Sequence, residues 1–107
     1  MFSRFFAKDS VTKKHAHFIA EVHVNTKEEG GHSAPIFDHY YPFFNFSNQE
    51  VRGFVHILNG FDLVMPGDTD QMEITLDAPA ACEVGTRFTI REEALTVGFG
   101  TITQILD

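Results

Sequence analysis

The sequence has little cysteine, few positive charges and no long apolar run. Its single cysteine, Cys82, excludes an intrachain disulfide and fits a reducing compartment. No apolar stretch approaches the roughly 20 residues that a bilayer-spanning helix needs. The opening MFSRFF is also too short for the apolar core of a secretory signal. We therefore expect a soluble cytoplasmic protein that makes no membrane contact.

Positive charge is scarce along the whole chain. Eight Lys and Arg residues stand against fifteen Asp and Glu residues, so the formal net charge is −7 with neutral histidine. A chain with this balance is repelled by nucleic acid unless its few cations gather on one face. The nucleotide-binding motif G-x-x-x-x-G-K-[ST] is also absent. The sequence thus predicts no bound nucleotide and no other cofactor.

Apolar and polar residues alternate along several short stretches, which is typical of half-buried β-strands. No stretch of 11 or more residues carries the apolar stripe of a helix. The length of 107 residues suits one domain, and we expect a lead-in segment at residues 1–15 and a single β-barrel domain at residues 16–107. The alternating apolar residues, expected on one face of each strand, are Phe18, Ala20, Val22, Val24, Phe44, Phe46, Val55, Ile57, Met72, Ile74, Leu76, Phe88 and Ile90.

Turn residues separate these stretches. Met65-Pro66-Gly67-Asp68 has the proline and glycine of a type II turn, and Asn59-Gly60 and Glu83-Val84-Gly85 mark further reversals. About six strands at this spacing predict an all-β barrel or sandwich. Gly98 and Gly100 in the last strand favour a small closed barrel, in which neighbouring backbones approach closely.

The stretch KEEGGHSAPI, residues 27–36, contains adjacent glycines that raise the question of a phosphate loop. Such a loop follows a strand, opens a helix and carries a Lys with a Ser or Thr. Here Gly30-Gly31 leads into His32-Ser33-Ala34-Pro35, with neither a helical segment nor a lysine. We interpret the stretch as a glycine turn with positive φ.

Six histidines raise the question of a metal site. His15 and His17 would share one face of a strand about 6.6 Å apart, with Glu21 or His23 as third candidates. His23, however, lies roughly 20 Å beyond His17 along an extended strand and cannot join the pair without a fold-back. Structural zinc usually takes four ligands, often thiolates. We favour solvated surface histidines and keep His15 and His17 as the metal candidates.

No group of residues combines a nucleophile, a base and an orienting side chain. Cys82 lies in PAACEV, where nothing visible lowers a thiol pKa. The pairs Glu28-Glu29 and Glu92-Glu93 are typical of solvated hairpin faces. We therefore expect no enzymatic activity.

Three separated motifs resemble one protein family. AEVHVNTKEEGGHSAPIFDHYYPFFNF, VMPGD, and RFTIRE followed by TVGFG are similar, in this order, to the C-terminal third domain of elongation factor Tu, the translation GTPase. The resemblance runs without gaps over nearly the whole chain and implies a six-stranded, antiparallel, closed β-barrel of Greek-key type. In the family, this domain helps to hold aminoacyl-tRNA, packs on the GTPase domain, contacts elongation factor Ts and carries no chemistry of its own.

Several departures from the family pattern remove positive charge. The family's arginine after Gly-Gly is His32, its arginine before proline is Tyr41, and its lysine near the end is Gln104. Arg52 is gained and Arg91 persists. Because RNA affinity rests largely on neutralised phosphates, these exchanges predict weakened tRNA binding. The residues that the resemblance implies for RNA or partner binding are His32, Tyr41, Arg52, Arg91 and Gln104.

We interpret the chain as a stand-alone, non-enzymatic binding module that contacts a protein partner or a second copy of itself. Apolar residues that sister domains would cover in the family supply the surface, and the candidates are Phe2, Phe5, Phe6, Ile36 and Phe37. The first three fit equally well as residues that complete the core. Two alternatives stay open: a translation role in binding aminoacyl-tRNA or an elongation factor, and a metal protein built on the histidines.

Overall fold

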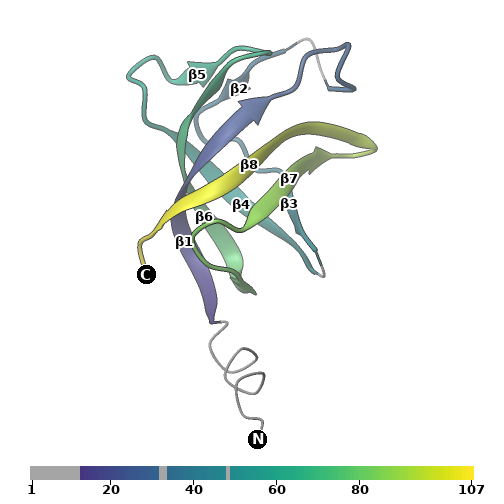
Figure 1. Ribbon diagram of the computed structural model, residues 1–107. Helices are drawn as coiled ribbons and strands as arrows, with labels where there is room; N and C mark the ends of the chain where they lie inside the picture. Colours follow the sequence, from purple (N-terminus) through teal and green to yellow (C-terminus); the bar gives the residue numbers. More distant parts are fainter. Residues whose placement is uncertain (1–12, 32–33, 48) are drawn as a thin grey trace, which may run out of the picture.

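The computed structural model describes residues 13–31, 34–47 and 49–107, which form an antiparallel β-barrel (Figure 1). Six strands close it in the order β1-β6-β4-β3-β7-β8, with β8 returning to β1, and β2 and β5 form a separate two-stranded sheet. The predicted six-stranded closed barrel is therefore confirmed. In this described part of the chain, no helix has the length and apolarity needed to cross a membrane. The strands are β1 Lys14–Val24, β2 Ile36–Phe37, β3 Phe43–Phe46, β4 Gln49–Ile57, β5 Leu63–Val64, β6 Thr69–Ala81, β7 Arg87–Glu92 and β8 Leu95–Ile105.

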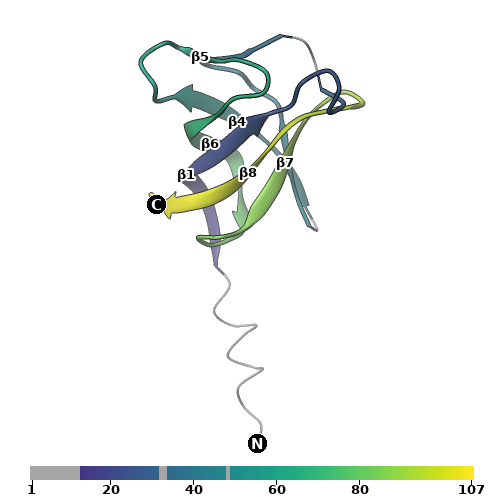
Figure 2. The same ribbon diagram turned by 45° about the horizontal axis from the view of Figure 1, so that its top comes forward.

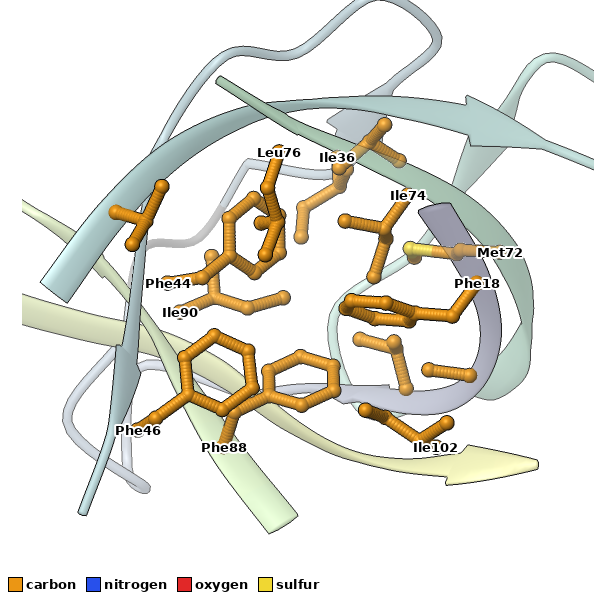
Figure 3. Packing of buried hydrophobic residues seen from close by; sticks show 14 of the residues in the cluster. Phe18, Ile36, Phe44, Phe46, Met72, Ile74, Leu76, Phe88, Ile90 and Ile102 are labelled. Atoms are coloured by element: carbon orange, nitrogen blue, oxygen red, sulfur yellow. The ribbon is translucent and has the colours of Figure 1, made fainter. Parts of the chain in front are cut away.

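The barrel interior is filled by the apolar residues that alternate along the strands. On β1, Phe18, Ala20 and Val22 are fully buried, while the side chains between them face outward, as a period of two requires. The rings of Phe18, Phe46 and Phe88 pack together with centroids 5.7 to 6.5 Å apart (Figure 3). Every residue that the alternation predicted for the apolar faces is buried.

Two glycines of β8 let the neighbouring strands approach closely. A Cβ atom on Gly98 would lie 2.7 Å from the carbonyl oxygen of His23, and one on Gly100 would lie 2.7 Å from Cζ of Phe88. Both distances are shorter than the contacts that Cβ atoms make in proteins. The close approach predicted for these glycines is confirmed.

One end of the barrel carries the Met65–Asp68 turn and the β2–β5 sheet (Figures 1 and 2). Gly67 has a φ of 91°, and the N–H of Asp68 donates to the carbonyl of Met65 at 3.0 Å, as the predicted type II turn requires. Val24, the last residue of β1, is hydrogen-bonded to this turn. The other end of β1 lies at the opposite end of the barrel and begins at Lys14, two residues before the domain start expected from the sequence.

Candidate binding surface

Two of the predicted binding residues lie in one row on the outside of the barrel. Arg91 of β7 and Arg52 of β4 are each directly opposite Phe43 of β3, which lies between them. Phe43 alternates with the inward-facing Phe44, so its ring points outward and is 39% exposed. The strand order thus brings together two arginines that are far apart in the sequence.

Arg52 is held in place by two aromatic rings and a carbonyl group. Its Cζ atom lies 4.3 Å from the ring centroid of Tyr41 and 4.9 Å from that of Phe43. Its Nε and Nη2 atoms donate to the carbonyl oxygen of Tyr41 at 3.3 and 3.2 Å. The Tyr41 ring in turn stacks on Phe54 with centroids 4.4 Å apart. We call Tyr41, Phe43, Arg52 and Phe54 the aromatic–arginine surface.

The two neighbouring tyrosines each donate a hydroxyl hydrogen bond to a carboxylate. Tyr41 donates to Asp77, and this hydrogen bond is the main cause of a raised Tyr41 pKa. Tyr40 donates to Glu92, and burial, followed by this hydrogen bond, raises the pKa of Tyr40. Both tyrosines therefore stay protonated at neutral pH and act as donors that orient the surface.

A hollow of about 260 Å³ lies between the two arginines. Its lining includes Arg52 and Arg91 and also Glu92 and Glu93. Nη1 of Arg91 donates to Oγ1 of Thr96 at 3.4 Å, which directs its guanidinium along β8. The acids next to the arginines offset much of their positive potential, so the hollow offers a mixed polar and aromatic surface.

Gln104 lies on a different part of the barrel. It pairs with Ile19 near the end of β8, whereas Arg91 pairs with Thr96 near the start of the same strand. The eight residue steps from Thr96 to Gln104 span about 26 Å at a rise of about 3.3 Å per residue. Gln104 is therefore apart from the aromatic–arginine surface, and the predicted residue His32 lies outside the described residues.

Sequence analysis missed Phe43 and Phe54 as binding candidates. Both are outward-facing, and Phe54 is 50% exposed. A signal was present, because each phenylalanine occupies a position that alternation assigns to solvent, next to the inward-facing Phe44 and Val55. An aromatic residue on the solvent face of a strand could have been noted as a surface anchor.

The predicted apolar partner surface is only partly formed. Phe37 is 55% exposed, but Ile36 is buried, with 4% of its surface accessible. Residues that are adjacent in a strand point to opposite faces, so the two could not both be exposed. The expectation for Ile36 is wrong, because this side chain belongs to the core. Phe2, Phe5 and Phe6 lie outside the described residues.

His15 and His17 each face a carboxylate. Nδ1 of His15 lies 3.1 Å from Oδ1 of Asp107, and Nε2 of His17 lies 2.5 Å from Oε2 of Glu73. The pKa of Asp107 is lowered, first by the N–H of Ala16 and also by His15. The register of β1 shifts between the two histidines. Across residues 13–31, 34–47 and 49–107, no three His, Cys, Asp or Glu side chains are grouped to hold a metal.

In the loop that contains Gly30 and Gly31, the backbone N–H groups donate hydrogen bonds within the loop itself. Gly30 has a φ of 94° and donates its N–H to the carbonyl of Lys27 at 3.0 Å, while Gly31 donates to the carbonyl of Thr26 at 2.9 Å. The carboxylate of Glu29 accepts the N–H of Thr26 at 2.8 Å, which lowers the pKa of Glu29. These donors are not available to a phosphate group. The predicted glycine turn is confirmed for Gly30.

Cys82 is placed where a nucleophile is disfavoured. Its side chain is buried, with 2% of its surface accessible, and burial raises the pKa of the thiol. A raised pKa leaves little of the reactive thiolate at neutral pH.

Comparison with known proteins agrees with the barrel. The family model described as elongation factor Tu C-terminal domain matches residues 11–106 of the 107-residue chain. The match includes all eight strands.

Proposed function

This chain belongs to the elongation factor Tu C-terminal domain family, and we propose that it is a non-enzymatic module that binds a protein through the aromatic–arginine surface. Family membership makes it a translation-related binding domain. The preference for a protein partner rests on one observation: the guanidinium of Arg52 is covered by the rings of Tyr41 and Phe43. We place this function in the cytoplasm.

The composition of the surface favours a protein partner. Aromatic residues and arginine are enriched in the centres of protein interfaces and supply most of their energetic anchors. Phe43 and Phe54 are 39% and 50% exposed, so their rings retain apolar area that a partner can cover. Tyr41 and Arg52, which lie between these two rings, are fixed by hydrogen bonds. This fixation lowers the conformational entropy that is lost on binding.

The charges around the surface disfavour RNA. Phosphate binding needs cations that displace counterions from the nucleic acid. Asp77 accepts a hydrogen bond beside Arg52, and Glu92 and Glu93 line the hollow next to Arg91. A phosphate that approached either arginine would also meet these carboxylates.

A tRNA-binding role is the second candidate, because Arg52 and Arg91 lie in one row of the barrel. It predicts micromolar or tighter tRNA binding that weakens steeply with salt. A low-salt mobility-shift titration that compares the wild type with Arg52→Ala and Arg87→Ala tests it. Loss of binding in Arg52→Ala alone would support this role.

Affinity capture from native lysate tests the protein-binding role, with retained protein and RNA measured together. Phe54→Asp changes the aromatic–arginine surface, and the matched control Val84→Asp changes a residue that is 60% exposed in a distant turn. We expect a specific protein to be retained by the wild type and Val84→Asp and lost from Phe54→Asp. Equal retention by both variants would contradict the assignment of the surface.

A further inference from the structure

The end of the barrel beside the β2–β5 sheet carries a second exposed apolar cluster. Phe61, Leu63 and Met65 line a hollow of about 490 Å³, and Phe37 is paired with Leu63 across the small sheet. Phe61 is 79% exposed, Phe37 55% and Met65 50%. We call Phe37, Phe61, Leu63 and Met65 the β2–β5 pole, and Figure 1 shows the β2 and β5 strands at this end of the barrel.

Phe61 is presented by a fixed loop. The side chain of Asn59 donates to the carbonyl of Leu63 and to the carboxylate of Asp70, each at 2.9 Å. Its Oδ1 atom accepts the N–H of Phe61 at 2.7 Å. Gly60, with a φ of 86°, makes the turn between them. These bonds hold the most exposed aromatic side chain of the described residues away from the core, so the exposure is built into the loop.

The rim of the pole is acidic. Asp68 and Asp70 both line the hollow, and none of the described residues that line it is a Lys or an Arg. A segment that fits this hollow therefore combines aromatic side chains with positive charge.

The chain itself contains a segment of this chemistry. Residues 1–12, MFSRFFAKDSVT, lie outside the described residues and carry three phenylalanines and a formal charge of +1. The remaining residues carry −8, one more negative charge than the whole chain. We infer that residues 1–12 of one copy dock on the β2–β5 pole of a second copy, with Phe2, Phe5 and Phe6 in the hollow and Arg4 and Lys8 beside its aspartates.

The direction of the chain favours this contact between two molecules over the same contact within one. Val24 is hydrogen-bonded to the Met65–Asp68 turn, whereas Lys14, the first residue of β1, lies at the opposite end of the barrel (Figure 1). The ten residue steps of β1 span about 33 Å. At about 3.5 Å per fully extended residue, Phe2 reaches about 42 Å from Lys14 but Phe6 only about 28 Å. The segment of the same chain would therefore have to fold back fully extended along its own barrel to bring Phe2 to the pole, whereas on a second copy it enters the pole without this constraint.

Two copies that lie antiparallel place the segment of each one at the pole of the other. Such a reciprocal exchange closes a two-fold dimer and leaves no open contact. Because attraction between Arg4 or Lys8 and the aspartates contributes, added salt weakens the dimer. This inference is independent of the partner proposed for the aromatic–arginine surface, which lies on β3, β4 and the segment just before β3.

Sedimentation velocity of the full chain over micromolar to sub-millimolar concentrations tests the inference. We expect the wild type to dimerise, and Phe61→Asp and the double variant Arg4→Glu/Lys8→Glu each to weaken the dimer by about tenfold or more. Val84→Asp changes an apolar residue that is 60% exposed elsewhere on the barrel, and this variant is expected to dimerise like the wild type. Circular dichroism and thermal melting confirm that each variant is folded.

Mixing the two disrupted variants identifies the contact directly. Phe61→Asp keeps an intact N-terminal segment and Arg4→Glu/Lys8→Glu keeps an intact pole, so the mixture restores one of the two contacts. We expect the mixture to associate more strongly than either variant alone. The inference would be overturned if the wild type were monomeric or if Val84→Asp weakened the dimer as much as Phe61→Asp. It would also be overturned if the mixture associated no better than its components.

Discussion

The ring of Phe54 stacks on the ring of Tyr41 on the outside of the barrel, with centroids 4.4 Å apart and planes inclined by 24°. The hydroxyl of Tyr41 is bound to Asp77 and its carbonyl to Arg52. The stacked pair is therefore fixed from two sides before any partner arrives. A preorganised aromatic surface loses little conformational entropy on binding, which makes these rings effective anchors.

Replacing Arg52 tests the stacked arrangement within the folded protein. Arg52→Ala removes a guanidinium that lies over two rings and is expected to lower the free energy of unfolding by about 0.5–1 kcal/mol. Arg87→Ala makes the same change of charge at another exposed arginine and is expected to stay within about 0.5 kcal/mol of the wild type. Urea unfolding measures both, and equal effects would show that charge alone matters.

Alkaline titration can detect the hydrogen bonds of the two tyrosines of the chain. The pKa of both Tyr40 and Tyr41 is raised, so tyrosinate absorbance should develop only above the ordinary pKa of 10.0. Asp77→Asn removes the carboxylate that accepts the Tyr41 hydroxyl, and one of the two tyrosines should then ionise at lower pH. An unchanged titration curve for Asp77→Asn would show that this hydrogen bond does not form in solution.

Asp38 makes the free energy of unfolding depend on pH in the acid range. The N–H of Ile57 at 2.8 Å, with His56 as a further donor, holds the pKa of Asp38 below its ordinary value of 3.8. Because the folded pKa lies below the unfolded one, the stabilisation is present above about pH 4 and is lost as the pH falls through the folded pKa. Asp38→Asn should destabilise the protein at pH 7 and approach the wild type near about pH 2. Parallel stability curves would contradict this linkage.

The alternation of apolar residues was sufficient to predict the strands and their buried faces, whereas the six-stranded closed barrel was implied by the family resemblance. Residues such as Phe18, Met72 and Ile90 are inward-facing because the period of a strand is two, and this holds whichever strands are neighbours. The row of Arg91, Phe43 and Arg52 could not be predicted in this way. It depends on which strands pair and in which register, and these are properties of the closed barrel rather than of any local stretch.

The dependence on strand pairing and register also explains the wrong predictions at the candidate sites. The sequence predicts that Ile36 and Phe37 belong to one apolar surface, but the short β2–β5 pairing buries the first and exposes the second. Gln104 stands where the family has a lysine and was predicted to act together with Arg91, yet β8 carries it away from the strand position that pairs with Arg91. Residues that act together in a family pattern need not be neighbours until strand register is known.

The close approach at Gly100 gives a test of the barrel itself. Gly100→Ala would place a Cβ atom 2.7 Å from Cζ of Phe88 and 2.9 Å from the carbonyl oxygen of Glu21. Relieving this overlap must move a ring or a backbone, which is expected to cost about 1–3 kcal/mol. Gln104→Ala, at an exposed position of the same strand, should stay within about 0.5 kcal/mol of the wild type. A neutral Gly100→Ala would show that the strands are not packed this closely.

Photo-crosslinking in the native cell tests the proposed protein contact most directly. A benzoylphenylalanine at position 54 keeps an aromatic ring on the aromatic–arginine surface, and the same residue at position 84 serves as the control. We expect a discrete crosslinked protein from position 54 and none from position 84. Crosslinks from position 54 that consist of tRNA, or equal protein crosslinks from both positions, would contradict it.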